Sequence, residues 1–343
     1  FAAERPDHVF LAAARVGGIV ANNTYPAEFI SQNLAIQTNV MTEAWRHGVQ
    51  HLLFLGSSCI YPRDCPQPIR ESYLLTGQLE NTNRAYAIAK IAGVETCWAY
   101  NRQYGTRFIA AMPTNLYGIG DHYDLQNSHV LPALIRKTHE AKLRGDPTVT
   151  VWGSGRPRRE LLISDDMADA CVFLANLPEK TYDELFAGNS LAPLVNIGYG
   201  SDLSIRELAE MAARVVGCKA RLRFDASKPD GTPRKLLDVS KCTAIGWRAR
   251  TKLADGVAAT YAWYLANAAS SAEVKTAIDT LVTKVDAVLT AQDNTVSSAY
   301  EAVVKATRDA KKPLFALDVS VVERGAIAAM AQNQYQAGMG WAK

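Results

Sequence analysis

The sequence contains no long apolar run and no block of like charges. Nowhere do about 18 or more apolar residues follow one another, and no apolar signal segment follows Phe1. These absences favour a cytoplasmic protein. The net charge is only +3, so neither nucleic acid nor an anionic membrane is expected as a partner.

The cysteines are also too far apart to form the close pairs of a structural zinc site. They stand at positions 59, 65, 97, 171, 218 and 242. A chain of 343 residues, 48% of them hydrophobic, can bury a core without disulfide bonds. We therefore expect a globular protein with reduced thiols and no metal.

Short apolar runs alternate with helical patterns in the first part of the chain. The sequence predicts strands over His8–Ala14, His51–Leu55 and Arg107–Met112, and helices over 30–47 and 84–103. This alternation is typical of an α/β fold with a doubly wound parallel sheet. Because such sheets bind ligands at the carboxyl ends of their strands, chemistry is expected after Ala14, Leu55 and Met112.

Shorter units follow and suggest a smaller second lobe. The sequence predicts helices over 129–142, 166–177, 204–216 and 252–266, and a strand over 148–152. Ser204 and Glu207 form a capping box at the start of the third of these helices. After Ala268-Ala269-Ser270-Ser271 a second α/β pattern begins, with strands over 285–290 and 314–317 around a helix over 295–311.

Tyr86 and Lys90 are four residues apart and share one face of a predicted helix. An ammonium close to a phenol favours the phenolate, which would make Tyr86 a proton donor and acceptor. Ser57, at the end of a predicted strand, could hydrogen-bond the same substrate carbonyl. The alternatives are a surface Tyr–Lys pair and a plain turn at Gly56-Ser57-Ser58.

Several sequence strings resemble the extended short-chain dehydrogenase/reductases. They are VGGI at 16–19, GSSCIYP at 56–62, YAIAK at 86–90, PTNLYG at 113–118, NSHV at 127–130 and DGTPRK at 230–235. Tyr-x-x-x-Lys marks the whole superfamily, whereas GSSCIYP, NSHV and DGTPRK in this order resemble the GDP-L-fucose synthase family. The resemblance runs from residue 1 to about 267. It implies a Rossmann-like fold, a homodimer, and the NADPH-dependent 3,5-epimerisation and 4-reduction of GDP-4-keto-6-deoxy-D-mannose.

On this resemblance Ser57, Tyr86 and Lys90 are the reductase residues, and Tyr86 protonates the C4 oxygen as hydride arrives. Lys90 also holds the nicotinamide ribose. The resemblance places the following residues at the cofactor: Gly56, Ser57, Ser58, Lys90, Pro113, Asn115, Leu116 and His129.

Cys59 and His129 match the epimerisation pair of that family. Protons next to a ketone are acidic, so a thiolate can remove one and an imidazolium can return one on the other face. Without the resemblance, Cys59 would be interpreted as a small buried apolar residue and His129 as a helix-start residue.

The resemblance also implies a set of residues that hold the GDP-sugar, namely Lys137, Trp152, Arg159, Arg221 and Lys235. Arginine forks suit phosphate oxygens. Lys137 stands where an arginine is expected, which keeps the charge but loses a bidentate contact. Trp152 could instead be a core residue.

Two features depart from the pattern. No G-x-x-G-x-x-G motif occurs before Ala14, so we expect an N-terminal truncation of about fifty residues, a bare apolar sheet edge and weakened cofactor affinity. In addition, residues 272–343 resemble the solute-binding proteins of ABC transporters. We interpret the chain as two partial genes joined by assembly error or by construction, with Asp293 and Asn294 as remnants of a ligand site or as a helix cap.

The predicted domains are a partial NADP-binding Rossmann domain over 1–128, a substrate-binding lobe over 129–267 and the solute-binding-protein-like fragment over 268–343. Two rival functions remain at this point. One is another nucleotide-sugar 4-epimerase or 4,6-dehydratase, which Cys59 and His129 argue against. The other is a non-catalytic solute-binding module, for which about seventy residues are too few to form two lobes.

Overall fold

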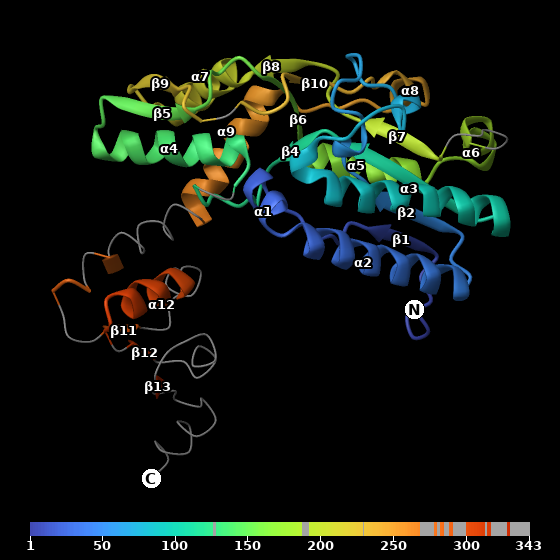
Figure 1. Cartoon of the computed structure of the whole chain (residues 1–343), viewed down its shortest axis with the longest axis horizontal. Helices are drawn as coiled ribbons and strands as arrows, with labels where there is room; N and C mark the ends of the chain where they lie inside the picture. Colours follow the sequence, from blue (N-terminus) through green and yellow to red (C-terminus); the bar gives the residue numbers. More distant parts are fainter. Residues whose placement is uncertain are drawn as a thin grey trace, which may run out of the picture. The chain divides into compact units, whose positions relative to one another are not determined.

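The main sheet of the computed structural model consists of four parallel strands in the order β1-β2-β3-β7 (Figure 1). The strands are β1 His8–Leu11, β2 His51–Leu55, β3 Arg107–Pro113 and β7 Leu194–Ile197. β1 is the edge strand of the sheet among the described residues, and Phe10 on it is 48% exposed. The Rossmann-like fold expected from the alternating pattern is confirmed.

Helices cover both faces of this sheet. Successive side chains on a strand point to opposite sides, so these buried strands present apolar side chains on both faces. On one face Phe54 and Phe108 pack against helices α2 Pro26–Arg46 and α3 Arg84–Tyr104, which lie side by side (Figure 1). On the other face Leu53 packs against α5 and α6. These two helices span Ser164–Ala175 and Glu179–Phe186.

A second set of strands lies outside the main sheet, in the region predicted to form a smaller lobe. β6 Arg158–Ile163 pairs with β4 Asn115–Tyr117 on one side and with β10 Arg234–Lys235 on the other, and β8 Asp202–Ser204 joins it in antiparallel orientation. A separate parallel pair is formed by β5 Thr148–Trp152 and β9 Arg221–Asp225. The remaining helices of this part are α1 Ile19–Thr24, α4 Val130–Arg144, α7 Ile205–Val216, α8 Ser240–Ala244 and α9 Leu253–Asn267.

The structure describes residues 1–125, 128–186, 192–228, 230–267, 278–279, 282–284, 288–290, 300–312, 314–316 and 328–329. They fall into two compact units, 1–260 and 261–343. In the second unit β11 Val288–Thr290, β12 Leu314–Ala316 and β13 Ala328–Ala329 form a parallel sheet with helix α12 Tyr300–Asp309. No helix within these described ranges is long and apolar enough to cross a bilayer.

Most of the predicted elements are confirmed to within a few residues, and the strands over 51–55 and 148–152 match in full. The first strand is shorter than predicted and ends at Leu11. The capping box is present, with the Ser204 hydroxyl accepting from the Glu207 amide at 3.2 Å. Asp293 and Asn294 lie outside the described residues.

Candidate active site

The centre of the candidate site is the sharp turn that follows β2. The Gly56 amide donates to the Ala111 carbonyl at 2.9 Å, which keeps the turn against the end of β3. A Cβ on Gly56 would lie 1.8 Å from the Met112 Cε, so a larger residue here would require the Met112 side chain to move. The glycine of GSSCIYP thus packs closely against Met112, and the turn holds the next residues at the carboxyl edge of the sheet.

Ser57 and Cys59 are fixed together by a single turn of 3-10 helix, η1 Ser58–Ile60, which Ser57 caps. The Ser57 hydroxyl accepts from the Cys59 amide at 3.4 Å. Ser58 and Cys59 are both buried. The plain-turn interpretation of these residues is therefore incomplete, because the turn presents a hydroxyl and a thiol at the same strand end.

Tyr86 and Lys90 come from the first turns of α3 and meet this strand end. The Lys90 ammonium donates to the Leu55 carbonyl at 2.7 Å and lies 4.7 Å from the Phe54 ring centroid. It is 5.8 Å from the Tyr86 ring centroid. Lys90 is only 2% exposed, so the pair is not a surface Tyr–Lys pair.

Burial has the largest effect on the pKa values of Tyr86 and Lys90. It raises the pKa of the Tyr86 phenol, the nearby Cys59 acts in the same direction, and a hydrogen bond with Ser57 opposes both. Burial also lowers the pKa of Lys90 to about 8. The pKa of the phenol is therefore raised rather than lowered, contrary to the expectation, because burial dominates and Lys90 is not among the groups that lower this pKa. A protonated phenol is nevertheless the form that a proton donor needs.

A cavity opens beside Cys59, and sequence reasoning missed part of its lining. Glu80 and Asn83, just before α3, contribute to it together with Lys235 from β10. The Asn83 Oδ1 is buried and has no hydrogen-bond partner among the described residues. Its position three residues before Tyr86, at the N-cap of α3, was the available signal.

The predicted nicotinamide neighbours lie at the next strand ends. Pro113 is the last residue of β3, and Asn115 and Leu116 belong to β4. The Asn115 side-chain amide donates to the Glu160 backbone carbonyl at 2.9 Å, which ties β4 to β6. These residues thus border the same carboxyl edge as Gly56.

His129 is in a different environment from Cys59. It is the exposed N-cap residue of α4, and its side chain does not cap the helix. Asp121 lies near enough for His129 to lower the pKa of that carboxyl, although burial raises this pKa more. No contact between His129 and Cys59 is present among the described residues, so the helix-start interpretation describes His129 in this conformation.

Trp152 is the exposed end of β5 rather than a core residue. Its side chain is 50% exposed, so the core-packing alternative is wrong. The Lys137 ammonium lies 4.6 Å from its ring centroid and the Lys228 ammonium 5.6 Å. An exposed indole flanked by two cations is a surface on which a planar, negatively charged ligand can stack.

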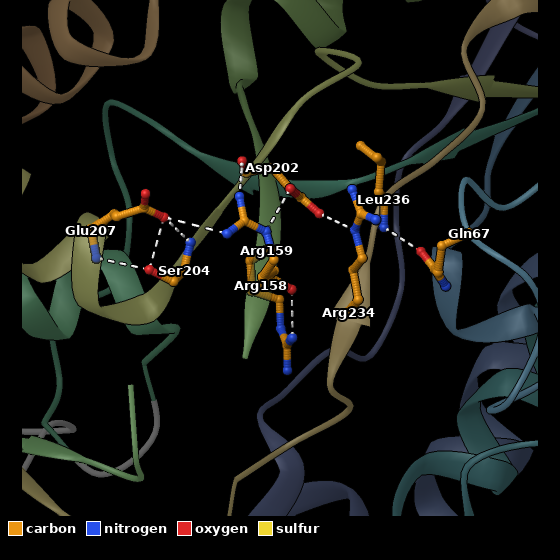
Figure 2. A network of polar contacts seen from close by, with 8 residues as sticks. All are labelled: Gln67, Arg158, Arg159, Asp202, Ser204, Glu207, Arg234 and Leu236. Carbon is orange, nitrogen blue, oxygen red and sulfur yellow. Dashed lines mark hydrogen bonds and ion pairs between the residues drawn. The ribbon is translucent and has the colours of Figure 1, made fainter. Parts of the chain in front are cut away.

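Arg159 and Lys235 are neighbours on paired strands, because β6 and β10 align them in register. The Arg159 guanidinium donates to the Thr232 carbonyl at 2.6 Å and to the Arg158 carbonyl at 2.7 Å. Figure 2 shows Arg158 and Arg159 pointing in opposite directions from β6. Arg158 instead bonds Asp202 at 2.8 Å.

Arg221 is not brought to this group of residues. It is the first residue of β9 and pairs with Thr148, whereas Trp152 pairs with Asp225 at the other end of the two strands. Four residues of strand correspond to about 13 Å. The structure thus separates Arg221 from Trp152, and it stays a sequence prediction without geometric support.

The donors at the strand end suit a nicotinamide ribose. The Lys90 ammonium donates one N–H to the Leu55 carbonyl and has two further N–H groups that can donate to a ligand. Ser57 and Tyr86 each add a hydroxyl group. A doubly wound sheet with Ser, Tyr and Lys gathered at its carboxyl edge defines a dinucleotide-dependent reductase of the short-chain type.

Comparisons with known proteins agree with this class. Residues 1–186 match the model of the NAD dependent epimerase/dehydratase family. The chain is 57% identical over 267 residues to GDP-L-fucose synthase 1 of Arabidopsis thaliana, covering 78% of this chain and 79% of the relative. The chain therefore belongs to the NAD dependent epimerase/dehydratase family, in the branch of the GDP-L-fucose synthases.

Two solved structures from Campylobacter jejuni are similar over the same region. One is a GDP-6-OMe-4-keto-L-xylo-heptose reductase, with 37% identity, a TM-score of 0.72 and coverage of 78% of this chain and 84% of that one. The other is a GDP-mannoheptose C4 reductase with NADP bound, with 38% identity, a TM-score of 0.69 and coverage of 77% and 83%. Residues 260–343 match a different model, that of ABC transporter substrate binding proteins.

Proposed function

We propose that residues 1–267 carry out the NADPH-dependent 3,5-epimerisation and 4-reduction of GDP-4-keto-6-deoxy-D-mannose to GDP-L-fucose. The observation that carries this proposal is the assembly of Ser57, Cys59, Tyr86 and Lys90 at one strand end. It is supported by the 57% identity to a GDP-L-fucose synthase. The homodimer and the cytoplasmic location implied by the resemblance stay predictions.

The reductive half depends on the buried phenol. NADPH supplies the hydride when it is bound. Tyr86 donates its proton to the C4 oxygen, and Ser57 holds that oxygen by a hydrogen bond. Because burial raises the pKa of Tyr86, the phenol stays protonated until the oxygen becomes basic. Lys90 holds the ribose with the N–H groups that Leu55 does not use.

In the epimerisation step, Cys59 is the base and His129 is the acid. The Cys59 thiolate removes a proton next to the ketone, and the electron pair of the C–H bond is delocalised onto the C4 oxygen. His129 then returns a proton on the opposite face of the sugar.

The GDP moiety is assigned to the small lobe. Trp152 offers a face for the guanine ring, and Arg159 and Lys235 offer positive charge to the phosphate oxygens. Lys137, beside Trp152, adds a point charge. A fork such as Arg159 gives two parallel hydrogen bonds to a phosphate, whereas a lysine gives charge without fixed geometry.

Substitution of Cys59 tests the assignment. In Cys59→Ser, exchange of solvent deuterium into C3 and C5 of the keto sugar should slow by at least about a hundredfold, while hydride transfer to an already epimerised substrate is spared. Mass spectrometry of the sugar and NADPH absorbance report the two steps separately. Unchanged exchange in Cys59→Ser removes the epimerase assignment and leaves the 4-epimerase or dehydratase rival.

The similarity of residues 260–343 to substrate binding proteins supports a second candidate, a solute-binding module. Thermal unfolding with a GDP-sugar and with small organic solutes separates the two. Stabilisation by the GDP-sugar supports the enzyme, because a ligand that binds the folded state raises its stability. Stabilisation by the solutes alone would favour the module.

A further inference from the structure

Cys59 and Lys235 line one cavity although they are far apart in the sequence. Cys59 comes from the η1 turn after β2, and Lys235 comes from the short strand β10. The other charged residues that line this cavity are Arg63, Glu80 and Arg234. A cation and a thiol that share a small polar cavity influence each other's charge strongly, because water screens them little.

Lys235 is held in this cavity by contacts on the other face of its strand. Arg234 and Arg158, side by side in register, both bond the carboxylate of Asp202, whose side chain is only 4% exposed (Figure 2). Because neighbouring residues on a strand point to opposite faces, this ion cluster turns Lys235 and Arg159 the other way.

The residue after Lys235 is tied to the segment that follows Cys59. The Leu236 amide donates to the Gln67 Oε1 at 2.9 Å, and the Leu236 carbonyl accepts from the Ile69 amide at 2.8 Å. The Leu237 amide also donates to the buried Glu160 carboxylate at 2.9 Å. The backbone around Lys235 is therefore fixed from both sides, which limits how far its ammonium can move from Cys59.

The thiol needs such a cation. Burial raises the pKa of Cys59, and a buried neutral thiol is a poor base. Of the groups that lower this pKa, Lys235 has the largest effect, followed by Ser57 and Lys90. Tyr86 faces Cys59 as well, and a thiolate there raises the pKa of the phenol.

Groups around Lys235 act on the pKa of its ammonium in both directions. Burial and the neighbouring Arg159 lower the pKa of its ammonium, while Cys59, Cys65 and Glu80 raise it. Of the cations that line the cavity, Arg63 lies 3.5 Å from Glu80 and Arg234 bonds Asp202, whereas Lys235 has no ion pair among the described residues. Ionisation of a thiol is therefore the compensating change that the site allows.

We propose that Lys235 acts through Cys59, as the positive charge that stabilises the thiolate needed to remove the proton next to the ketone. This inference rests on the proposed function and adds a role in epimerisation to a residue so far assigned to GDP-sugar binding. The thiolate takes the proton, the C–H electron pair passes to the ketone oxygen, and the Lys235 ammonium keeps its proton throughout.

The pH dependence of Cys59 alkylation tests the inference without sugar or NADPH. The intact chain is treated with iodoacetamide between about pH 6 and pH 10, and each cysteine is followed by peptide mass spectrometry. In Lys235→Met the midpoint for Cys59 should rise by at least about one unit, with an alkylation rate at neutral pH about tenfold lower. Lys235→Arg should restore most of the wild-type midpoint, because it restores the charge.

Two controls separate charge from structure. Arg63→Gln removes another cation that lines the cavity and should leave the Cys59 midpoint unchanged. Cys218, in a loop between α7 and β9, serves as the reference thiol in every variant. If the Cys59 midpoint in Lys235→Met equals that of the wild type, or if Lys235→Arg fails to restore it, the inference is overturned. Deuterium exchange at C3 and C5 tests the proposed function separately.

Discussion

The residues assigned to hydride transfer and those assigned to the GDP-sugar are positioned in different ways. Ser57, Tyr86 and Lys90 come from one strand end and one helix that packs directly on it. Arg159 and Lys235 come from strands that pair across more than seventy residues of sequence. The first group therefore depends on local patterns, and the second depends on long-range pairing.

The two groups also differ in how their charges are compensated. Lys90 is buried beside a backbone carbonyl and the faces of aromatic rings. Arg159 is held by backbone carbonyls as well, but its neighbour Arg158 on the opposite face pairs with Asp202. The ion pairs of the small lobe thus serve the framework. Lys235, unlike Arg63 and Arg234 in the same cavity lining, has no carboxylate in direct contact among the described residues.

The largest effect is expected from the reductase residues. Tyr86→Phe removes the proton donor, and kcat for reduction should fall by about a hundredfold to ten-thousandfold. The fold should persist, because the phenol ring and its edge contact with Phe29 at 6.1 Å are kept. NADPH consumption measures the loss. Tyr104→Phe, an exposed position on the same helix, is the control and should keep its rate.

Lys90 should titrate at an unusually low pH in the protein without cofactor. Its pKa is lowered from 10.5 to about 8 by burial, so the unfolded chain binds more protons than the folded one between these values. Stability should consequently rise with pH across this window, by up to about 3 kcal/mol. Denaturant unfolding of the wild type and Lys90→Met at several pH values measures this, and a pH-independent difference between them contradicts it.

Glu160 holds the long-range strand pairing together and is completely buried. Its carboxylate accepts from the Gly200 amide at 2.7 Å and from the Leu237 amide at 2.9 Å. Glu160→Ala leaves these donors without partners and should lower the free energy of unfolding by about 2 to 3 kcal/mol. Glu184→Ala, in an exposed ion pair on α6, should change it by less than about 0.5 kcal/mol in the same urea titration.

The cations of the small lobe should affect binding more than turnover. Arg159→Gln should raise KM for the GDP-sugar by about tenfold, because one charge-assisted fork to phosphate is lost, with kcat changed little. Arg158→Gln, on the opposite face of β6, should leave KM within about twofold. Equal effects of the two substitutions on KM would contradict the assignment of the two faces.

The smallest effect is expected at Arg221. Because it pairs with Thr148, at the far end of the strands from Trp152, Arg221→Gln should leave KM for the GDP-sugar within about twofold. A large rise in KM would show that the ligand extends further along β9 than the other residues indicate.

Much of the fold could be predicted from periodicity, but several short strands could not, β6 among them. The strand at His51–Leu55 and the helix with Tyr86 and Lys90 follow from short apolar patterns. β6 was missed because its first residues, Arg158-Arg159-Glu160, are charged. These charges are compatible with a strand only because Asp202 and backbone donors from other segments compensate them.

In the candidate site, too, some residues could be identified from the sequence and others could not. The residues Ser57, Cys59, Tyr86 and Lys90 were identified from the sequence, and Asn83 and Glu80 in the cavity wall were not. The sign of the Tyr86 shift was predicted wrongly, because charge proximity can be seen in a spacing but desolvation cannot.

The sequence by itself determined the family, the alternating architecture and the side chains that do the chemistry, because these depend on residue type and short-range spacing. Only the tertiary structure decided that Lys235 shares a cavity with Cys59, that Trp152 is exposed and that Arg221 lies apart from it. Strand pairing and burial bring together or separate residues that are distant in the chain, and they set the charge state of each group through its loss of water.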